Sequence, residues 1–207
     1  MSFRLPSPLY AIADPCGRTD LDPVRIAEEM LDGGARILQL RWKEASSGAL
    51  HRAAAAIRRR TRDRGALFIV NDRVDVAAAV EADGVHLGQD DLPIAVARRE
   101  LPGGIVGIST HDLPQACAAD RSGADYIGFG PLFATTTKPT SYSPRRLEML
   151  REVRHAVTAP IVAIGGISLE NATSALGAGA SAVAMISALV LAPSIRAEVE
   201  RALLSLR

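Results

Sequence analysis

The stretch LFIVNDRVDVAAAVEADGVHL, residues 67–87, contains two short apolar runs separated by a longer amphipathic segment. The runs Leu67–Asn71 and Gly84–Leu87 have the length and apolar content of parallel strands that are buried on both faces. The segment between them, Arg73–Glu81, has a helical pattern. The stretch therefore predicts a β–α–β unit, which is the building block of a parallel sheet.

The same alternation runs from one end of the chain to the other. The predicted strands are Leu9–Ala13, Ile37–Arg41, Leu67–Asn71, Gly84–Leu87, Ile105–Ser109, Tyr126–Gly130, Ile161–Ile164 and Ala182–Ile186. The predicted helices are Asp22–Asp32, Ser46–Arg64, Arg73–Glu81, Pro93–Glu100, Leu113–Ser122, Pro144–Val157, Leu169–Leu176 and Pro193–Leu206. Eight strand–helix pairs of about 25 residues each predict that residues 1–207 form one α/β domain, a single-domain (β/α)8 TIM barrel. The alternative is a doubly wound open sheet, which usually has fewer strands at this length.

Composition excludes several classes of function. The 24 basic and 23 acidic side chains give a net charge of +1, so we expect no binding to nucleic acid or to an anionic membrane. No apolar run approaches the roughly 18 residues of a membrane span, and the N-terminus lacks the apolar core of a signal peptide. Cys16 and Cys117 have neither a CxxC spacing nor a His/Cys cluster nearby, so we expect a reduced, cytoplasmic protein. The sequence leaves a homo-oligomer open.

Polar side chains gather where the first predicted strands end, which is where a barrel carries its chemistry. Period-two alternation in Gln39-Leu40-Arg41-Trp42-Lys43 places Gln39, Arg41 and Lys43 on one face, as a phosphorylated ligand would require. The alternative is an ion-pair network inside the barrel.

Acidic residues follow the next two strands. Asp72 comes directly after the strand that ends at Asn71, and Asp90-Asp91 come shortly after the strand that ends at Leu87. Two carboxylates beside cationic phosphate binders favour a Mg²⁺ site. The alternative for Asp72 and for Asp91 is a helix cap.

The later strand ends offer further anion ligands. Ser109 is a donor for a phosphate oxygen, and His111 is either an acid–base group, a helix cap or a surface residue. Thr135, Thr136, Thr137 and Lys138 form a long loop after a Gly-Pro turn, as in a functional lid. Gly165-Gly166 and Ile186-Ser187 follow strands seven and eight, where barrels bind phosphate. His86 has the position of a packed core histidine.

These residues predict two anion sites. One lies near strands two to five and includes Mg²⁺, which suits a diphosphate, and the other lies near strands seven and eight. Such a pair of sites indicates a transferase that joins two phosphorylated small molecules.

The chain resembles the thiamine phosphate synthase family, and the resemblance covers nearly all of it. Seven motifs in order carry it: QLRWK (39–43), NDR (71–73), GVHLGQDD (84–91), GISTH (107–111), DYIGFGPLFATTTK (125–138), VAIGGI (162–167) and VAMISAL (183–189). The family is a (β/α)8 barrel. It condenses hydroxymethylpyrimidine diphosphate with hydroxyethylthiazole phosphate and releases pyrophosphate, by a dissociative route in which pyrophosphate leaves first.

The resemblance also implies roles for individual residues. Asp72 and Asp91 would bind Mg²⁺, with Asp90 as an adjacent non-ligand. The pyrimidine diphosphate would be held by Gln39, Leu40, Arg41, Trp42, Lys43, Asn71, Ser109 and Lys138, of which Arg41, Ser109 and Lys138 are the expected catalytic residues. The thiazole phosphate would be held by Thr135, Thr136, Thr137, Gly166, Ile186 and Ser187.

Two other functions fit a barrel of this kind. A thiazole tautomerase is an isomerase that shares the fold and lacks the acidic metal pair, and a non-catalytic binder of phosphorylated ligands would lack a working Mg²⁺ site. The retention of Asp72 and Asp91 favours the synthase. Lys43 and Lys138 are the chain's two lysines, and both lie in motifs where a compact ammonium suits departing phosphate oxygens.

Overall fold

The structure is a computed structural model that describes residues 3–134 and 143–206. Eight parallel strands form a closed barrel in chain order, and the ring closes where β1 pairs with both β2 and β8. The strands are β1 (Leu9–Ala13), β2 (Ile37–Leu40), β3 (Leu67–Asn71), β4 (Gly84–Leu87), β5 (Ile105–Thr110), β6 (Tyr126–Phe129), β7 (Ile161–Ala163) and β8 (Ala182–Met185). The predicted (β/α)8 barrel is confirmed, and the open sheet is excluded.

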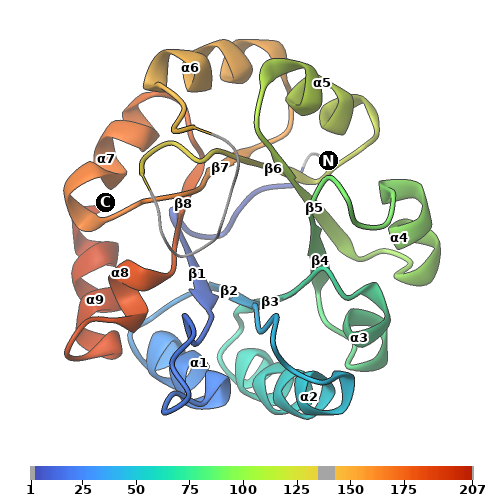
Figure 1. The fold of residues 1–207 in the computed structure, drawn as a ribbon, viewed down its shortest axis with the longest axis vertical. Coiled ribbons are helices and arrows are strands. Elements are labelled where there is room, and N and C mark those ends of the chain that lie inside the picture. Colours follow the sequence, from blue (N-terminus) through green and yellow to red (C-terminus); the bar gives the residue numbers. More distant parts are fainter. Residues whose placement is uncertain (1–2, 135–142, 207) are drawn as a thin grey trace.

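Helices surround the strands on the outside of the ring (Figure 1). They are α1 (Pro23–Asp32), α2 (Ser47–Asp63), α3 (Val74–Ala79), α4 (Ile94–Glu100), α5 (Leu113–Arg121), α6 (Leu147–Ala156), α7 (Leu169–Gly177), α8 (Ser187–Val190) and α9 (Ile195–Ser205). None of the described helices is both long and apolar enough to cross a membrane.

Local sequence explains where these helices begin. The Asp22 side chain accepts a hydrogen bond from Val24 N at 2.9 Å, and Pro23 occupies the first turn of α1, so the helix begins where the predicted range Asp22–Asp32 does. Helix α6 begins at Leu147 and not at the predicted Pro144. The reason is that Arg145 N donates to Pro131 O at 2.6 Å, which ties the preceding segment to the loop after β6.

Alternation along the strands divides the buried residues into two layers. Leu9, Ala11 and Ala13 of β1 belong to the larger cluster, between the barrel and its helices. Tyr10 and Ile12 belong to a smaller cluster inside the barrel. The members of this interior cluster are Tyr10, Ile12, Ile37, Ile69, Tyr126, Val162, Ala182 and Ala184. The inward positions beyond it, at the carboxyl ends of the strands, are therefore free for polar residues.

Candidate active site

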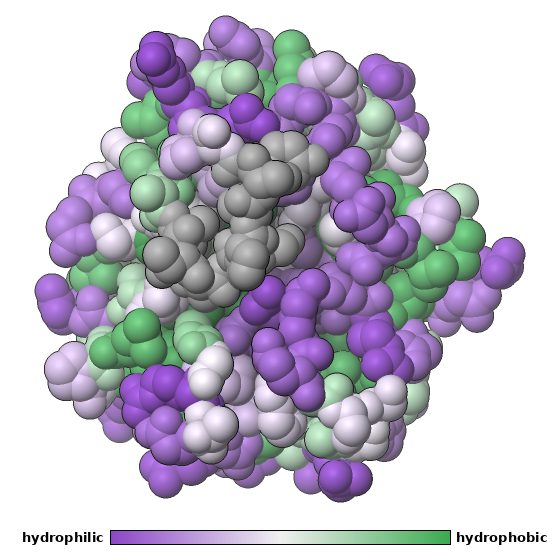
Figure 2. Space-filling view, viewed as in Figure 1, coloured by the Kyte–Doolittle hydropathy of each residue, from purple (hydrophilic) through white to green (hydrophobic). Residues whose placement is uncertain are grey.

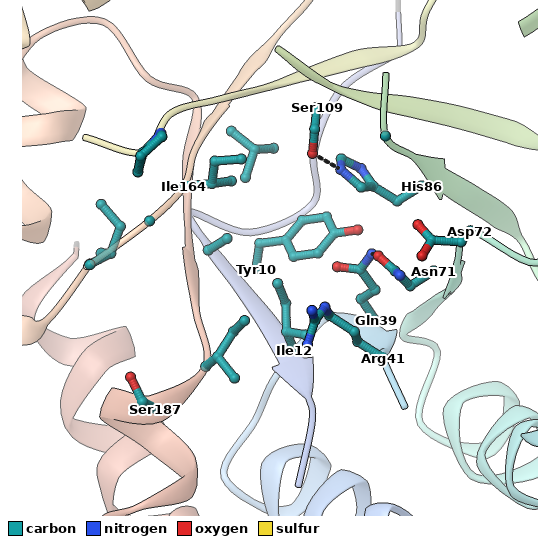
Figure 3. Close-up of a pocket in the computed structure, with 18 of the residues that line it drawn as sticks. Tyr10, Ile12, Gln39, Arg41, Asn71, Asp72, His86, Ser109, Ile164 and Ser187 are labelled. Carbon is teal, nitrogen blue, oxygen red and sulfur yellow. Dashed lines mark hydrogen bonds between the residues drawn. The ribbon is translucent and has the colours of Figure 1, made fainter. Parts of the chain in front are cut away.

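A cavity of about 730 Å³ opens above the interior cluster, at the carboxyl ends of the strands. Tyr10, Gln39, Asn71 and His86 line it and come from four different strands (Figure 3). On this face of the molecule, hydrophilic residues gather over the ends of β2, β3 and β4 (Figure 2). Polar groups therefore converge where a barrel of this type carries its chemistry.

The end of β2 divides the predicted pyrimidine-binding run into two faces. Gln39, Arg41 and Lys43 line the cavity. Leu40 is fully buried in the cluster between barrel and helices, and Trp42 packs against that cluster. Period-two alternation thus turns both side chains away from the cavity, and the expected contact of Leu40 and Trp42 with substrate stays a prediction.

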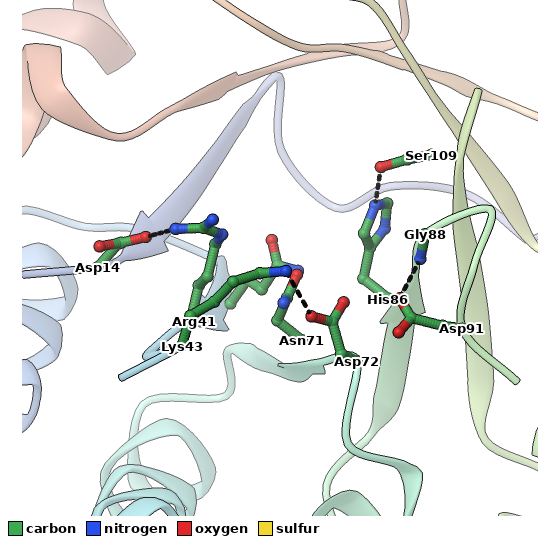
Figure 4. Close-up of polar contacts among 10 residues, drawn as sticks. Asp14, Arg41, Lys43, Asn71, Asp72, His86, Gly88, Asp91 and Ser109 are labelled. Carbon is green, nitrogen blue, oxygen red and sulfur yellow. Dashed lines mark hydrogen bonds and ion pairs between the residues drawn. The ribbon is translucent and has the colours of Figure 1, made fainter. Parts of the chain in front are cut away.

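Arg41 is held by an acidic residue that the sequence analysis missed. Its guanidinium forms an ion pair with Asp14, the residue that follows β1, and the exposed fractions of the two side chains are 14% and 5% (Figure 4). The second oxygen of Asp14 accepts a hydrogen bond from Cys16 N at 2.7 Å. Asp14 thus fixes the position of Arg41, while Arg41 still lines the cavity.

Lys43 lies beside the predicted metal ligand Asp72, with Nζ 3.2 Å from Oδ2. Arg41 and Lys43 therefore form ion pairs and also line the cavity, so both interpretations of these cations hold at once. Asp72 has a left-handed backbone with φ of 61°, and its N–H donates to the His86 carbonyl at 2.8 Å. Its side chain does not cap α3, since the residue at that N-cap is Arg73.

Asp91 approaches the same point from the loop after β4. Its Oδ2 accepts a hydrogen bond from Gly88 N at 2.7 Å, and Pro93, not Asp91, is the N-cap residue of α4. Burial raises the pKa of the Asp91 carboxyl, and the neighbouring Asp72 carboxylate raises it further, against the lowering effects of the Gly88 N–H and of Lys43. Two carboxylates therefore share one site.

The acidic pair stands without a third ligand of its kind. In the part of the chain that the structure describes, no group of three or more His, Cys, Asp or Glu side chains is placed to hold a metal. This donor set does not suit zinc. It does suit Mg²⁺, which keeps several waters and binds through one or two carboxylates together with substrate phosphates.

The amide pair Gln39 and Asn71 lies next to the charged groups. Gln39 Nε2 donates to Asn71 Oδ1 at 3.1 Å. This bond fixes both amide planes and directs the Gln39 carbonyl oxygen away from Asn71. Both residues line the cavity, as the sequence predicted.

Ser109 and His86 are joined on the next two strands of the ring, β5 and β4. His86 Nε2 lies 2.8 Å from Ser109 Oγ, and Gln89 Nε2 donates to the Ser109 carbonyl at 2.7 Å. His86 is only 8% exposed, which confirms its expected place in the core. His111 also lines the cavity, and its Nδ1 lies 2.6 Å from the Gly130 carbonyl oxygen, while Asp112 caps α5.

Glycines and apolar residues form the cavity wall at β7 and β8. Gly165 and Gly166 have φ of 83° and 66°, which favour glycine. A Cβ on Gly166 would lie 2.4 Å from the Ala134 carbonyl oxygen, so the glycine lets the loops after β6 and β7 approach. Gly166, Ile186 and Ser187 line the cavity together.

Four of the predicted site residues cannot be placed. Thr135, Thr136, Thr137 and Lys138 lie outside the described residues. Their proposed contacts rest on the sequence alone.

The missed residues have signals of two kinds. Asp14 directly follows the predicted first strand, so the rule that strand ends carry the chemistry would have identified it. Tyr10 and Tyr126 lie inside apolar strands and carry no local sign that they face a cavity. Only closure of the barrel brings them together.

Comparison with known proteins identifies the family. The model of the thiamine monophosphate synthase family matches residues 9–189. A curated thiamine-phosphate synthase from Moorella thermoacetica is 50% identical over 186 residues, with coverage of 89% of this chain and 87% of the relative. The corresponding protein of Chloroflexus aurantiacus is 47% identical over 189 residues, with coverage of 91% and 88%.

A solved structure agrees with these relatives. The thiamine phosphate pyrophosphorylase from Pyrococcus furiosus superposes with a TM-score of 0.88 at 39% identity, covering 96% of this chain and 94% of that one. Sequence, fold and relatives converge on one transferase activity, and the chain belongs to the thiamine monophosphate synthase family.

Proposed function

We propose that the cavity holds the two substrates of thiamine phosphate synthesis in adjoining subsites. The pyrimidine diphosphate lies against β2 to β5, near Gln39, Arg41, Lys43, Asn71 and Ser109. The thiazole phosphate lies against Gly166, Ile186 and Ser187. The observation that carries this proposal is that Arg41, Lys43, Asp72 and Asp91 line the same cavity as the glycine turn after β7.

Asp72 and Asp91 are the residues proposed to hold Mg²⁺. Burial and then the neighbouring Asp72 carboxylate raise the pKa of Asp91, and a divalent cation at this point would offset the cost of holding two carboxylates together. When bound, Mg²⁺ neutralises charge that develops on the diphosphate.

The chain's own residues act by charge and position. The carbon–oxygen bond between the pyrimidine methylene and the diphosphate breaks, the diphosphate keeps the electron pair, and the thiazole nitrogen then bonds to the methylene carbon. Arg41 and Lys43 donate to the departing phosphate oxygens, and Lys138 is expected to join them. Asp14 keeps Arg41 aligned. The apolar side chains of Ile164 and Ile186 line the cavity and limit the access of water to the pyrimidine methylene cation that the departure of diphosphate leaves.

Thr135, Thr136 and Thr137 are proposed to contact the thiazole phosphate, on the resemblance alone. The cytoplasmic location and a homo-oligomer likewise stay predictions from the sequence.

Removal of one acidic ligand tests the two-subsite arrangement. Asp91→Ala should abolish turnover, because the metal site loses one of its two carboxylates, while calorimetric titration with thiazole phosphate gives a nearly unchanged dissociation constant. Asp90→Ala is the matched control and should keep turnover. Asp91→Asn should also lose turnover while keeping an acceptor for Gly88 N, which separates metal loss from loop damage. Equal loss of turnover and of thiazole phosphate binding would contradict two subsites, and undiminished turnover would show that Asp91 is not a metal ligand needed for the reaction.

A further inference from the structure

A row of four hydrogen-bonded side chains crosses the interior of the barrel. The Tyr10 and Tyr126 hydroxyl oxygens are 2.7 Å apart, Tyr126 Oη is 2.9 Å from His86 Nδ1, and His86 Nε2 is 2.8 Å from Ser109 Oγ. All four residues are buried, with at most 8% exposure. They come from β1, β6, β4 and β5, so strands on opposite sides of the barrel are linked through polar atoms. Figure 3 shows the last of these bonds, from His86 to Ser109.

Two glycines make room for the rings in this row. A Cβ on Gly107 would lie 2.0 Å from Tyr126 Cζ, and a Cβ on Gly128 would lie 3.1 Å from His86 Cε1. The His86 and Tyr126 rings stack with centroids 5.5 Å apart and an interplanar angle of 24°. Packing therefore fixes the positions of both rings. The assignment of donor and acceptor in each hydrogen bond of the row is not fixed by packing.

The protons in the row can point in one of two directions. A neutral imidazole has one donor and one acceptor nitrogen, so His86 either donates to Ser109 or accepts from it. Burial raises the pKa of both tyrosines, so each phenol keeps its proton. Within the described residues, the hydrogen-bond partner of the Tyr10 hydroxyl is the hydroxyl of Tyr126. The direction of this bond therefore decides whether the Tyr10 proton has an acceptor.

Donor satisfaction selects the direction. If Ser109 donated to His86, the protons would run toward Tyr10, whose hydrogen would then have no acceptor among the described residues. In the opposite direction Tyr10 donates to Tyr126, Tyr126 donates to His86 Nδ1, and His86 Nε2–H donates to Ser109 Oγ. The remaining proton, that of the Ser109 hydroxyl, then points into the cavity.

We propose that His86, oriented by Tyr126 and Tyr10, is a positioning residue that presents Ser109 as a hydrogen-bond donor to an acceptor atom of the pyrimidine diphosphate. The proposal rests on the proposed place of Ser109 in the pyrimidine subsite. Tyr10, Tyr126 and His86 thus have no contact with the substrate of their own in this proposal, and they act on it by orienting Ser109. It also predicts that this subsite selects ligands with an acceptor opposite Ser109.

Nitrogen-15 NMR of the free protein tests the direction of the row. The signals of His86 are assigned by comparison with His51→Gln, His111→Gln and His155→Gln variants. We expect His86 in the neutral form with the proton on Nε2. Tyr126→Phe should abolish this preference, because Nδ1 loses its donor, whereas Tyr10→Phe should retain it, because Tyr126 still donates. A proton on Nδ1 in the parent protein would overturn the proposal.

A double-mutant cycle tests whether the row acts through Ser109. Loss of one hydrogen bond should raise the KM for the pyrimidine diphosphate about three- to tenfold in Tyr126→Phe. In a Ser109→Ala background the same Tyr126→Phe substitution should have no further effect, because the group being positioned is gone. Equal losses in the two backgrounds would show that Tyr126 acts by packing alone and would overturn the proposal. The NMR measurement needs no substrate, so it can fail independently of the proposed function.

Discussion

At the scale of single residues, the active-site cations are controlled by acidic partners. Arg41 and Lys43 face the cavity from one strand end, but each has its own carboxylate, Asp14 for Arg41 and Asp72 for Lys43. The pair with Asp14 is buried and that with Asp72 is partly exposed, with 46% of the Lys43 side chain accessible. Arg41 is therefore fixed in position, and in the proposed function Lys43 exchanges Asp72 for a phosphate oxygen.

Substitution of Asp14 tests the fixed position of Arg41. Asp14→Asn keeps the shape of the side chain and removes the charge-assisted bond, which contributes about 1.5–3 kcal/mol when a charged group is involved. We expect kcat/KM for the pyrimidine diphosphate to fall about ten- to hundredfold. Steady-state kinetics measure this loss.

The matched control is Asp20→Asn, which breaks the exposed ion pair with Arg18. Exposed pairs contribute little, so this variant should keep the parent kcat/KM. Equal kinetics for the two variants would show that Asp14 does not orient Arg41.

At the scale of elements, the alternation of apolar runs predicted all eight strands, and the bounds of β1, β3 and β4 agree with the structure. Helix α8 was missed because its four residues directly follow β8 and are too few to show a helical period. Leu40 and Trp42 were assigned to the substrate although alternation itself turns them outward.

The interior row of tyrosines was beyond prediction from sequence. Its members are up to 116 positions apart in the chain, and they meet only when the barrel closes. The positions of Gln39, Arg41, Asp72 and Asp91 could be predicted because each lies at or shortly after the carboxyl end of a strand, and all these strand ends share one face of a barrel.

Strand β5 offers a test of interior packing. Gly107→Ala should destabilise the protein by about 1–3 kcal/mol, because the added methyl group overlaps the Tyr126 ring. Thermal or urea unfolding measures the change. Gly177→Ala in α7 is the control, since its Cβ meets no atom within 4 Å and should leave the protein equally stable or slightly more so. Unfolding midpoints that are the same for both variants would show that the Tyr126 ring is not fixed as described.

At the scale of the whole molecule, metal binding at the proposed site should be linked to stability. The pKa of Asp91 is raised in the folded state, so Asp91 contributes stability at low pH that is lost as the pH rises through its folded pKa. At neutral pH the ionised Asp91 carboxylate beside Asp72 therefore weakens the fold. A cation between them should reverse this effect.

Thermal unfolding with and without Mg²⁺ measures that linkage. At ten times the dissociation constant, Mg²⁺ should stabilise the parent protein by about 1.4 kcal/mol, which raises Tm by about 3–6 °C. Asp91→Asn should show no such rise, and without metal its Tm should exceed that of the parent at neutral pH. An equal rise in both proteins would place the metal elsewhere.

We propose that this barrel joins the two phosphorylated substrates with the help of Mg²⁺ held by Asp72 and Asp91. The most direct measurement incubates the purified protein with pyrimidine diphosphate, thiazole phosphate and Mg²⁺, and quantifies thiamine phosphate and pyrophosphate over time. We expect the two products in equal amounts, and their formation should stop when the metal is chelated and resume when Mg²⁺ is restored. A folded protein that forms neither product, or that forms both at the same rate without metal, would contradict the claim.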